Sequence, residues 1–370
     1  MPRPTYAEVD LGAIRRNFRA LKAQVRPGVR MLAIIKADAY GHGAAAVGRA
    51  LEQAGVDMFG VVLVEEGVAL RKAGLLKPIL VMGIAPDDEI AEAMRSDLAV
   101  TVDSVCTAGA VQRVAAATGC TARVHLKIDT GMNRLGFRAE EMPEAAAAIA
   151  RMDRLKLEGA YTHFACADED DEKPSQDQLV QLKSALAGLR SAGVLPPLVH
   201  AANSAAILRI PSAHFDMVRS GLALYGIRPY EAAPGNDLRP VLALMSRVAH
   251  LKRVRRGEGV SYGHRWKAPR DSLLGVLPIG YADGYRRLLS NRAQVRISGH
   301  LCPVRGTICM DATMVDLTDV PGAAVGMEAT LLEASHDSPL SAGALAELCD
   351  TIAYEILTGI SGRVPRVYIG

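Results

Sequence analysis

Short runs of hydrophobic residues alternate with alanine-rich stretches of helical spacing through the first two thirds of the chain. Apolar runs of this kind, bounded by turn formers, predict strands that are buried on both faces. The first run, Met31 to Ile35, leads directly into Lys36. The other seven runs are Phe59 to Val64, Ile79 to Met82, Leu98 to Val102, Val124 to Ile128, Leu157 to His163, Leu198 to His200 and Phe215 to Val218.

The stretches between these runs predict helices. Asp10 can cap a first helix, whose apolar face is formed by Ile14, Phe18, Leu21 and Val25. Four glycines follow helical stretches and can supply left-handed C-terminal caps, namely Gly55, Gly74, Gly119 and Gly193. Eight strand–helix units in about 220 residues predict an α/β fold with one (β/α)8 barrel. The alternative, a doubly wound sheet, would need fewer strands or a topological switch.

The pattern changes after the turn-rich segment Glu231 to Pro240, which is the predicted domain boundary. The strand candidates beyond it are Val241 to Val254, Leu273 to Ile279, Ala293 to Ile297, Met310 to Leu317 and Ala329 to Leu332. One late helix is predicted from the spacing of Leu345, Leu348, Ile352 and Ile356. We therefore predict a barrel over residues 1–235 and a mainly β domain over residues 236–370. Roughly the first 10 residues could pack with the second domain.

Composition and charge narrow the class of protein. The chain has 370 residues, of which 49% are hydrophobic and 22% are charged, as in soluble globular proteins. A net charge of +3 is too small to indicate nucleic acid or a membrane as partner. The densest basic run, Lys252 to Arg256, follows a strand-like segment and is interpreted as a solvated edge.

Cysteine usage and the N-terminus predict a cytoplasmic protein. The six cysteines contain no CxxC pair, which indicates reduced thiols. The spacing of His300, Cys302 and Cys309 matches no common zinc pattern, so no metal site is predicted. The first residues lack an apolar leader, and no stretch reaches the length of a membrane span.

Polar side chains stand at the C-terminal ends of five predicted strands. A surface lysine is the commoner explanation for Lys36 alone, and a strand-end histidine or arginine is often structural. Five such strands sharing one rim are much less expected by chance, and this rim is where barrels place their chemistry. The groups are Lys36, Lys127 with Asp129, His163, His200 followed by Asn203 and Ser204, and Arg219 followed by Ser220 and Gly221.

These groups suggest a pyridoxal phosphate site. A desolvated lysine such as Lys36 can lose its proton and attack a carbonyl to form a Schiff base. Ser204 and Gly221 lie in the loops after the seventh and eighth strands, which commonly bind phosphate in this fold. The lysine would hold the cofactor aldehyde, and the loops would hold its phosphate.

The chain resembles the alanine racemases, which are barrel-type pyridoxal-phosphate enzymes, over nearly its whole length. The matching stretches are AIIKADAYGHG, HLKIDTGMNRLGF, YTHFACAD, HAANSAA, VRSGLALYG, VSYGH, PIGYADGY, ICMD and TIAYEILTGISGRVPR. The resemblance implies interconversion of L-alanine and D-alanine by two bases, which would supply D-alanine for peptidoglycan. It also implies a homodimer with shared active sites.

The resemblance assigns a role to each matching residue. Lys36 would hold the cofactor and act as one base. Tyr262, which could otherwise be a packed strand tyrosine, would reach the opposite face from the partner subunit as the other base. Arg219 would face the pyridine nitrogen, and Arg134 with the backbone of Met310 would bind the substrate carboxylate.

Further residues would complete the site by the same resemblance. The phosphate would lie among Tyr40, Ser204, Gly221 and Tyr354, and His163 would also contact the cofactor. Carbamylation of Lys127 would create an anion that orients Arg134. His163, His200, Arg219 and Tyr281 could supply a partly cationic environment for the Tyr262 phenolate. Asp311, in ICMD, would support the site.

Three other functions are compatible with parts of this pattern. A racemase of another small amino acid, such as serine, would share the whole constellation. A decarboxylase on the same barrel would be expected to pair the pyridine nitrogen with a carboxylate, and Arg219 argues against it. A non-catalytic pyridoxal-phosphate carrier would be a single barrel, so the β domain with Tyr262 argues against that function.

Overall fold

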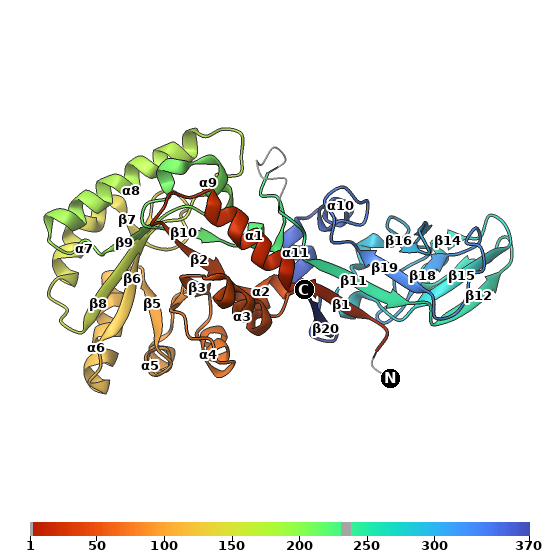
Figure 1. Ribbon diagram of the computed structural model, residues 1–370, viewed down its shortest axis with the longest axis horizontal. Coiled ribbons are helices and arrows are strands. Elements are labelled where there is room, and N and C mark those ends of the chain that lie inside the picture. Colours follow the sequence, from red (N-terminus) through yellow and green to blue (C-terminus); the bar gives the residue numbers. More distant parts are fainter. Residues whose placement is uncertain (1–2, 231–237) are drawn as a thin grey trace. The chain divides into compact units, whose positions relative to one another are not determined.

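The computed structural model describes residues 3–230 and 238–370 (Figure 1). The chain forms two compact units. The barrel unit consists of residues 15–39 and 44–238, and the β unit of residues 1–14, 40–43 and 239–370. The predicted boundary at residues 231–240 falls largely on residues 231–237, which lie outside the described residues.

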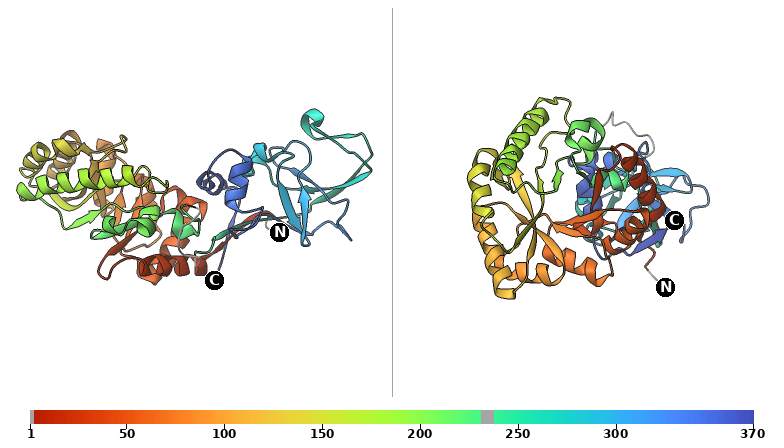
Figure 2. Two further views of the ribbon diagram at one scale, coloured as in Figure 1. Left: turned by 90° about the horizontal axis from the view of Figure 1, so that it is seen from above. Right: turned by 60° about the vertical axis from the view of Figure 1, so that its left-hand side comes forward.

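Within the described residues, eight parallel strands close into a barrel, as predicted. Each strand pairs with the next along the ring β2-β3-β4-β5-β6-β8-β9-β10, and β10 pairs back with β2. The right-hand view in Figure 2 shows helices surrounding this ring. The strands are β2 Arg30–Ile34, β3 Met58–Val61, β4 Ile79–Val81, β5 Leu98–Val102, β6 Ala122–Asp129, β8 Leu155–Tyr161, β9 Leu198–His200 and β10 Met217–Ser220. The short β7 (Phe137–Arg138) pairs with β6 beside the ring.

The helices begin and end where capping residues occur in the sequence. Asp10 Oδ1 accepts a hydrogen bond of 2.8 Å from Ala13 N, which confirms the predicted cap of α1 (Leu11–Ala23). The four predicted cap glycines, Gly55, Gly74, Gly119 and Gly193, have φ of +90°, +88°, +68° and +72°. The remaining barrel helices are α2 Lys36–Gly41, α3 Ala44–Ala54, α4 Val64–Lys72, α5 Asp87–Arg95, α6 Val105–Thr118, α7 Met142–Ile149, α8 Lys173–Ser191 and α9 Ser204–Arg209.

Three predicted strand ends were wrong by a few residues. The run to Val64 leaves the sheet after Val61, because the Glu66 carboxylate accepts backbone N–H bonds from Val62 and Leu63 and starts α4. Lys36 begins α2 instead of ending β2, and His163 lies two residues beyond β8. These shifts leave all the predicted rim groups at or just beyond the carboxyl ends of their strands.

The β unit is built mainly from antiparallel sheets, as predicted. A six-stranded sheet has the order β17-β16-β19-β11-β1-β20, and smaller sheets have the orders β12-β15-β18 and β13-β14. The N-terminal strand β1 (Tyr6–Asp10) pairs with both β11 and β20. The other strands are β11 Leu242–Arg247, β12 His250–Val254, β13 Gly259–Val260, β14 Trp266–Lys267, β15 Ser272–Leu277, β16 Gln294–Ile297, β17 His300–Pro303, β18 Thr313–Asp316, β19 Glu328–Leu332 and β20 Arg366–Ile369.

Several predicted elements of this unit need correction. The long strand from Val241 divides into β11 and β12, which belong to different sheets. Met310 lies in the loop before β18 and not in a strand. The late helix is two helices, α10 (Ala342–Leu348) and α11 (Ala353–Thr358), because Asp350 adopts a left-handed φ of +53° between them.

The basic run at the end of β12, the cysteines and the hydropathy of the helices each had an expectation from the sequence. β12 is an edge strand, and Lys252 and Arg253 are exposed, which confirms the solvated edge. The six cysteines are all free thiols. In the described part of the chain, no helix has the length and hydropathy needed to cross a membrane.

Candidate active site

Arg219 lies at the centre of the polar groups on the barrel rim. It is the third residue of β10 and is only 2% exposed. Its Nη1 donates to the carbonyl of His200 at 2.8 Å and lies 3.1 Å from His200 Nδ1. Its Nη2 donates to the carbonyls of Thr162 and Ala201 at 2.6 and 2.9 Å, and lies 3.3 Å from His163 Nδ1. The guanidinium is therefore held by both terminal nitrogens, which leaves Nε as the donor outside these bonds.

Burial and the charge of Arg219 keep the neighbouring imidazoles neutral. Burial lowers the pKa of Arg219 to about 10, so the guanidinium stays cationic at neutral pH. Burial first, and then Arg219, lowers the pKa of His163 to about 3 and that of His200 well below its usual value. The His200 ring stacks on Tyr161 with centroids 4.8 Å apart. The cationic character expected around this site therefore comes from Arg219 and not from the histidines.

Lys36 enters the rim from a left-handed turn. Ala37, Asp38, Ala39 and Tyr40 have φ between +49° and +54°, a conformation that costs L-residues about 1–2 kcal/mol each. The turn is held by Glu66, which accepts from Ala37 N at 2.6 Å, and by Asp38, which accepts from Ala44 N at 2.7 Å. A strained backbone that is held this firmly is typical of functional sites.

The electrostatic surroundings of Lys36 favour its neutral amine. Burial lowers the pKa of Lys36, and the positive charge of Arg134 lowers it further, whereas Glu66 acts in the opposite direction. A lysine with a depressed pKa has a larger fraction of nucleophilic, unprotonated amine at neutral pH.

Lys127 is a second lysine with a depressed pKa on the rim. It is buried on β6, and its Nζ donates to the carbonyls of Ile128 and Leu135 at 3.0 and 3.1 Å. Burial lowers its pKa to about 8, although Asp129 opposes the shift. About a tenth of this amine is therefore neutral at pH 7, far more than for a lysine of ordinary pKa.

Asp129 shapes the loop that carries Arg134. Its Oδ1 accepts backbone N–H bonds from Gly131, Met132 and Asn133 at 2.9, 2.9 and 3.1 Å. These bonds hold the pKa of Asp129 below its usual value, although burial opposes them. Asp129, which the sequence placed on the rim without a role, therefore orders this loop.

The two predicted phosphate loops meet at Ser204. Its Oγ accepts backbone N–H bonds from Gly221 and Ala223 at 3.0 and 3.3 Å. Ser204 is the first residue of α9, and Asn203 caps that helix by accepting from Ala206 N at 3.0 Å. A hydroxyl and backbone N–H groups therefore converge beyond β9 and β10.

Tyr40 and Tyr354 form a pair inside the β unit. Their ring centroids are 5.9 Å apart, and burial raises the pKa of Tyr40. The neighbouring Gly41 allows a close approach of two backbones, because a Cβ there would lie 2.4 Å from the carbonyl oxygen of Leu357. Residues 40–43 thus pack with the β unit although they lie between two barrel strands in sequence.

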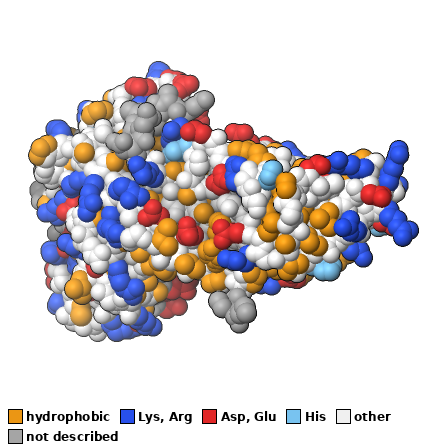
Figure 3. All heavy atoms as spheres, turned by 45° about the vertical axis from the view of Figure 1, so that its right-hand side comes forward, with side chains coloured by type: hydrophobic (Ala, Val, Ile, Leu, Met, Phe, Trp, Pro, Cys, Tyr) orange, Lys and Arg blue, Asp and Glu red, His pale blue; other side chains and the backbone are white. Residues whose placement is uncertain are grey.

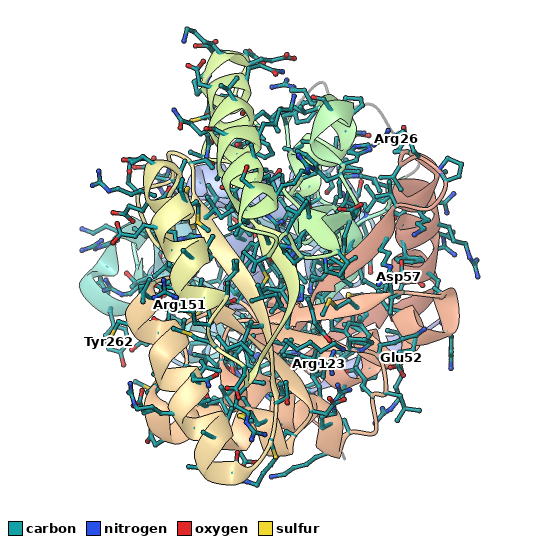
Figure 4. The ribbon with its side chains drawn as sticks, turned by 90° about the vertical axis from the view of Figure 1, so that its left-hand side faces the viewer. Arg26, Glu52, Asp57, Arg123, Arg151 and Tyr262 are labelled. Atoms are coloured by element: carbon teal, nitrogen blue, oxygen red, sulfur yellow. The ribbon has the colours of Figure 1, made fainter. Side chains whose placement is uncertain are left out.

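Tyr262 stands on a short turn of the β unit, and its side chain is 71% exposed (Figure 4). Ser261 has a φ of +61°, and its Oγ donates to the carbonyl of Thr307 at 2.5 Å. Thr307 Oγ1 donates in turn to the carbonyl of Tyr262 at 2.9 Å. The backbone of the turn is therefore clamped while the phenol remains exposed to solvent within its own chain.

The loop around Met310 is held by neighbouring backbone. Tyr281 N and Ala282 N each donate at 3.1 Å, to the carbonyls of Cys309 and Met310. Asp311 accepts from Arg363 at 2.7 Å. Figure 3 shows hydrophobic side chains at the surface of the β unit, and Met310 is one of the exposed apolar residues, with 52% exposure.

The predicted site residues thus divide between the two units. The positive charges of four rim residues lower the pKa of His163, namely those of Arg219, Arg134, Lys127 and Lys36. The structure therefore brings these rim groups together. Ser204 and Gly221 meet on the same unit. The predicted residues of the β unit are Tyr40, Tyr262, Tyr281, Met310, Asp311 and Tyr354.

Three buried polar residues of the barrel had no predicted role in the sequence. Tyr161 stacks on His200, and Gln178 donates to Thr130 Oγ1 and the His163 carbonyl at 3.2 and 3.0 Å. The third, His125, contacts His200. His125 could have been found, because it is a polar residue inside an otherwise apolar strand run. Gln178 lies on a helix, and nothing in the sequence around it indicates a buried polar role.

Comparison with known proteins identifies the family. The closed parallel barrel with its basic rim, together with the β unit, defines the class of two-unit α/β-barrel proteins. The models of the N-terminal and C-terminal domains of alanine racemase match residues 9–229 and 241–368. The chain belongs to the alanine racemase family, and its activity is the interconversion of L-alanine and D-alanine.

Relatives match nearly the whole chain. It is 43% identical to the alanine racemase of Desulfovibrio desulfuricans, over 99% of this chain and 98% of that protein. A solved alanine racemase of Clostridium difficile 630 has a TM-score of 0.95 and 36% identity, and the match covers 100% of this chain and 96% of that one. The alanine racemase of Bartonella henselae with covalently bound pyridoxal phosphate has a TM-score of 0.89 and 29% identity, with both chains fully covered.

Proposed function

We propose that the chain racemises alanine with pyridoxal phosphate, and that Lys36 and Tyr262 act as the two bases. The observation that carries this proposal is the position of Lys36, whose pKa is depressed, on the same rim as the buried Arg219. The covalently bound pyridoxal phosphate in the Bartonella henselae relative supports the choice of cofactor.

The donor groups on the rim fit this cofactor. The Ser204 oxygen accepts from the N–H groups of Gly221 and Ala223, so its own O–H is oriented away from them and suits a phosphate as a donor. Arg219 Nε is a donor that suits the pyridine nitrogen, and Lys36 supplies an amine for the aldehyde. When bound, the cofactor would supply an electron sink for the α-carbon of alanine.

The two bases would act on opposite faces of the α-carbon. Lys36 would hold or release a proton at Nζ on one face, where burial and Arg134 favour its neutral form. Tyr262 would do so at its phenol oxygen on the other face. Because that phenol is 71% exposed in its own chain, we assign it to the site of a partner subunit in a homodimer.

The other site residues would bind and orient. Arg134 and the backbone at Met310 would hold the substrate carboxylate. Arg219 cannot readily give up its proton, so it would keep the pyridine nitrogen unprotonated and limit side reactions. The remaining roles are those of Tyr40, Tyr354, Ser204 and Gly221 at the phosphate, His163 at the cofactor, and His200, Tyr281 and Asp311 in support.

Lys127 would be carbamylated. With its pKa lowered to about 8, its neutral amine can attack carbon dioxide, forming an N–C bond and losing a proton. The resulting anion would orient Arg134. We place the reaction in the cytoplasm, where the six free thiols would stay reduced, as a source of D-alanine for peptidoglycan.

Proton exchange in deuterated water tests the assignment of the bases. We expect Tyr262→Phe to lose D-alanine formation, yet to exchange the α-proton of one alanine enantiomer with solvent. Lys36→Ala should lose the visible absorbance of lysine-bound cofactor. Tyr285→Phe is the matched control, because the buried hydroxyl of Tyr285 has no hydrogen-bond partner among the described residues, and it should retain racemisation.

Two results would contradict the assignment. Equal exchange from both enantiomers in Tyr262→Phe would rule out one base per face. Lysine-bound cofactor that persists in Lys36→Ala would rule out Lys36 as the attachment point.

A further inference from the structure

His125 forms the third link of a buried chain that starts at Arg219. Arg219 Nη1 lies 3.1 Å from His200 Nδ1, and His200 Nε2 lies 2.9 Å from His125 Nδ1. The side chains of all three residues are buried. The two imidazoles meet edge to face, with centroids 5.1 Å apart.

The chemistry of these groups determines where each proton lies. Arginine only donates, so His200 Nδ1 must accept from Arg219. A neutral imidazole has one donor and one acceptor, so His200 Nε2 carries its proton and donates to His125 Nδ1. The same rule then places the proton of His125 on Nε2.

Both histidines remain neutral in this position. Burial lowers the pKa of His125 to about 4, and burial together with Arg219 lowers that of His200 well below its usual value. A cationic ring at His200 would lose the lone pair that Arg219 needs and would repel the guanidinium.

The barrel is built to hold the His125 ring. A Cβ at Gly159, on the adjacent β8, would lie 2.3 Å from His125 Nδ1, so a larger residue would displace the ring. His125 Nε2 has no hydrogen-bond partner among the described residues. An unpaired buried polar atom is costly, so a histidine kept in this core indicates a use for its other nitrogen.

We propose that His125 is a positioning residue for racemisation, and that it sets the tautomer of His200 which holds Arg219 in place. This inference rests on the proposed role of Arg219 toward the pyridine nitrogen. Without an acceptor at residue 125, the donor at His200 Nε2 is left unpaired. The alternative tautomer of His200 would turn an N–H toward Arg219 Nη1 and remove the one side-chain acceptor on that nitrogen, so the guanidinium would be held there by the His200 carbonyl alone.

Nitrogen NMR of the full-length protein tests the tautomers directly. With 15N-labelled histidine, at pH 7 and both with and without cofactor, we expect His200 and His125 to be neutral and protonated at Nε2. A charged His200, or one protonated at Nδ1, would overturn the inference. This measurement needs no variant and does not depend on the reaction.

Two variants at residue 125 then test the consequence. In His125→Leu we expect kcat to fall about tenfold, with KM for alanine nearly unchanged and more pyruvate formed per racemisation. In His125→Asn the amide oxygen stands near the position of Nδ1 and can accept from His200, so activity and product ratio should largely recover.

The outcomes separate this inference from the proposed function. Equal losses in the leucine and asparagine variants, or an unchanged product ratio in the leucine variant, would overturn the positioning role and leave Lys36 and Tyr262 as bases. If the leucine variant does not fold, the tautomers in the unaltered protein decide the question.

Discussion

Arg219 shows how the barrel accommodates a buried cation. Carbonyl oxygens at the ends of β9 and beyond β8 accept from its terminal nitrogens, so the charge is hydrogen-bonded although it is withdrawn from water. The histidines beside it are neutral, and therefore the positive potential at this point of the rim originates in the guanidinium.

Arg219→Glu should shift the balance between racemisation and side reactions. A carboxylate can share a proton with the pyridine nitrogen, which would strengthen the electron sink and favour transamination. Pyruvate formed from alanine per racemisation event measures this shift, and circular dichroism verifies the fold. The exposed Arg256→Glu is the control. An unchanged ratio would contradict the proposed pairing of Arg219 with the ring nitrogen.

At the scale of the element, the left-handed turn of α2 separates two packing environments. Lys36 to Ala39 belong to the barrel unit, and Tyr40 to Gly43 pack with the β unit. A right-handed helix would carry the chain along a different path, so the positive φ values are part of how Lys36 and Tyr40 face their separate surroundings.

Gly41→Ala should destabilise the protein more than Gly55→Ala does. Both glycines have positive φ, of +83° and +90°, so alanine costs about 1–2 kcal/mol at either position. At Gly41 the added Cβ also meets the Leu357 carbonyl oxygen at 2.4 Å, whereas nothing lies within 4 Å of it at Gly55. Urea unfolding compares the two losses, and equal values would show that the Leu357 contact has no energetic weight.

At the scale of the whole molecule, the two proposed bases belong to different units of the chain. If Tyr262 serves the partner's site, each active site in a homodimer draws one base from each subunit. A single inactive chain can therefore still donate its intact base to a different inactive chain.

Mixing two inactive variants should restore activity. After Lys36→Ala and Tyr262→Phe chains are dissociated and reassociated in equal amounts, half of the dimers are mixed, and each mixed dimer has one intact site. We expect about a quarter of the unaltered activity, measured by coupled detection of D-alanine. Mixtures that stay inactive, although mass spectrometry shows mixed dimers, would place both bases on one chain.

The buried histidines also predict how stability depends on pH. Their pKa values are lowered in the folded protein, to about 4 for His125, about 3 for His163 and well below the usual value for His200. Below pH 6.5 the unfolded chain therefore binds more protons than the folded chain, and acid favours unfolding.

The free energy of unfolding should accordingly fall by up to about 4 kcal/mol per pH unit between pH 6 and 5. Urea titrations at several pH values measure how the free energy of unfolding changes with pH. At lower pH the carboxyl groups with lowered pKa values add to this change in the same direction. His125→Asn should reduce the slope by about a third, whereas the exposed His250→Asn should leave it unchanged.

The local pattern of apolar and capping residues was sufficient to predict the eight barrel strands, the glycine caps and the mainly β second unit. Apolar period and capping residues act over a few positions, so they can be recognised without the fold. Because parallel strands end on one rim, the groups Lys127, His200 and Arg219 could also be placed together in advance.

Only the folded chain decides which distant groups meet. His125 and His200 are 75 residues apart and touch because β6, β8 and β9 pair in one register. Long-range pairing also places β1 in the sheet of the β unit. Residues 40–43 likewise pack with the β unit, although their neighbours in sequence belong to the barrel unit. Such contacts depend on strand register and packing over the whole fold, which no short window of residues contains.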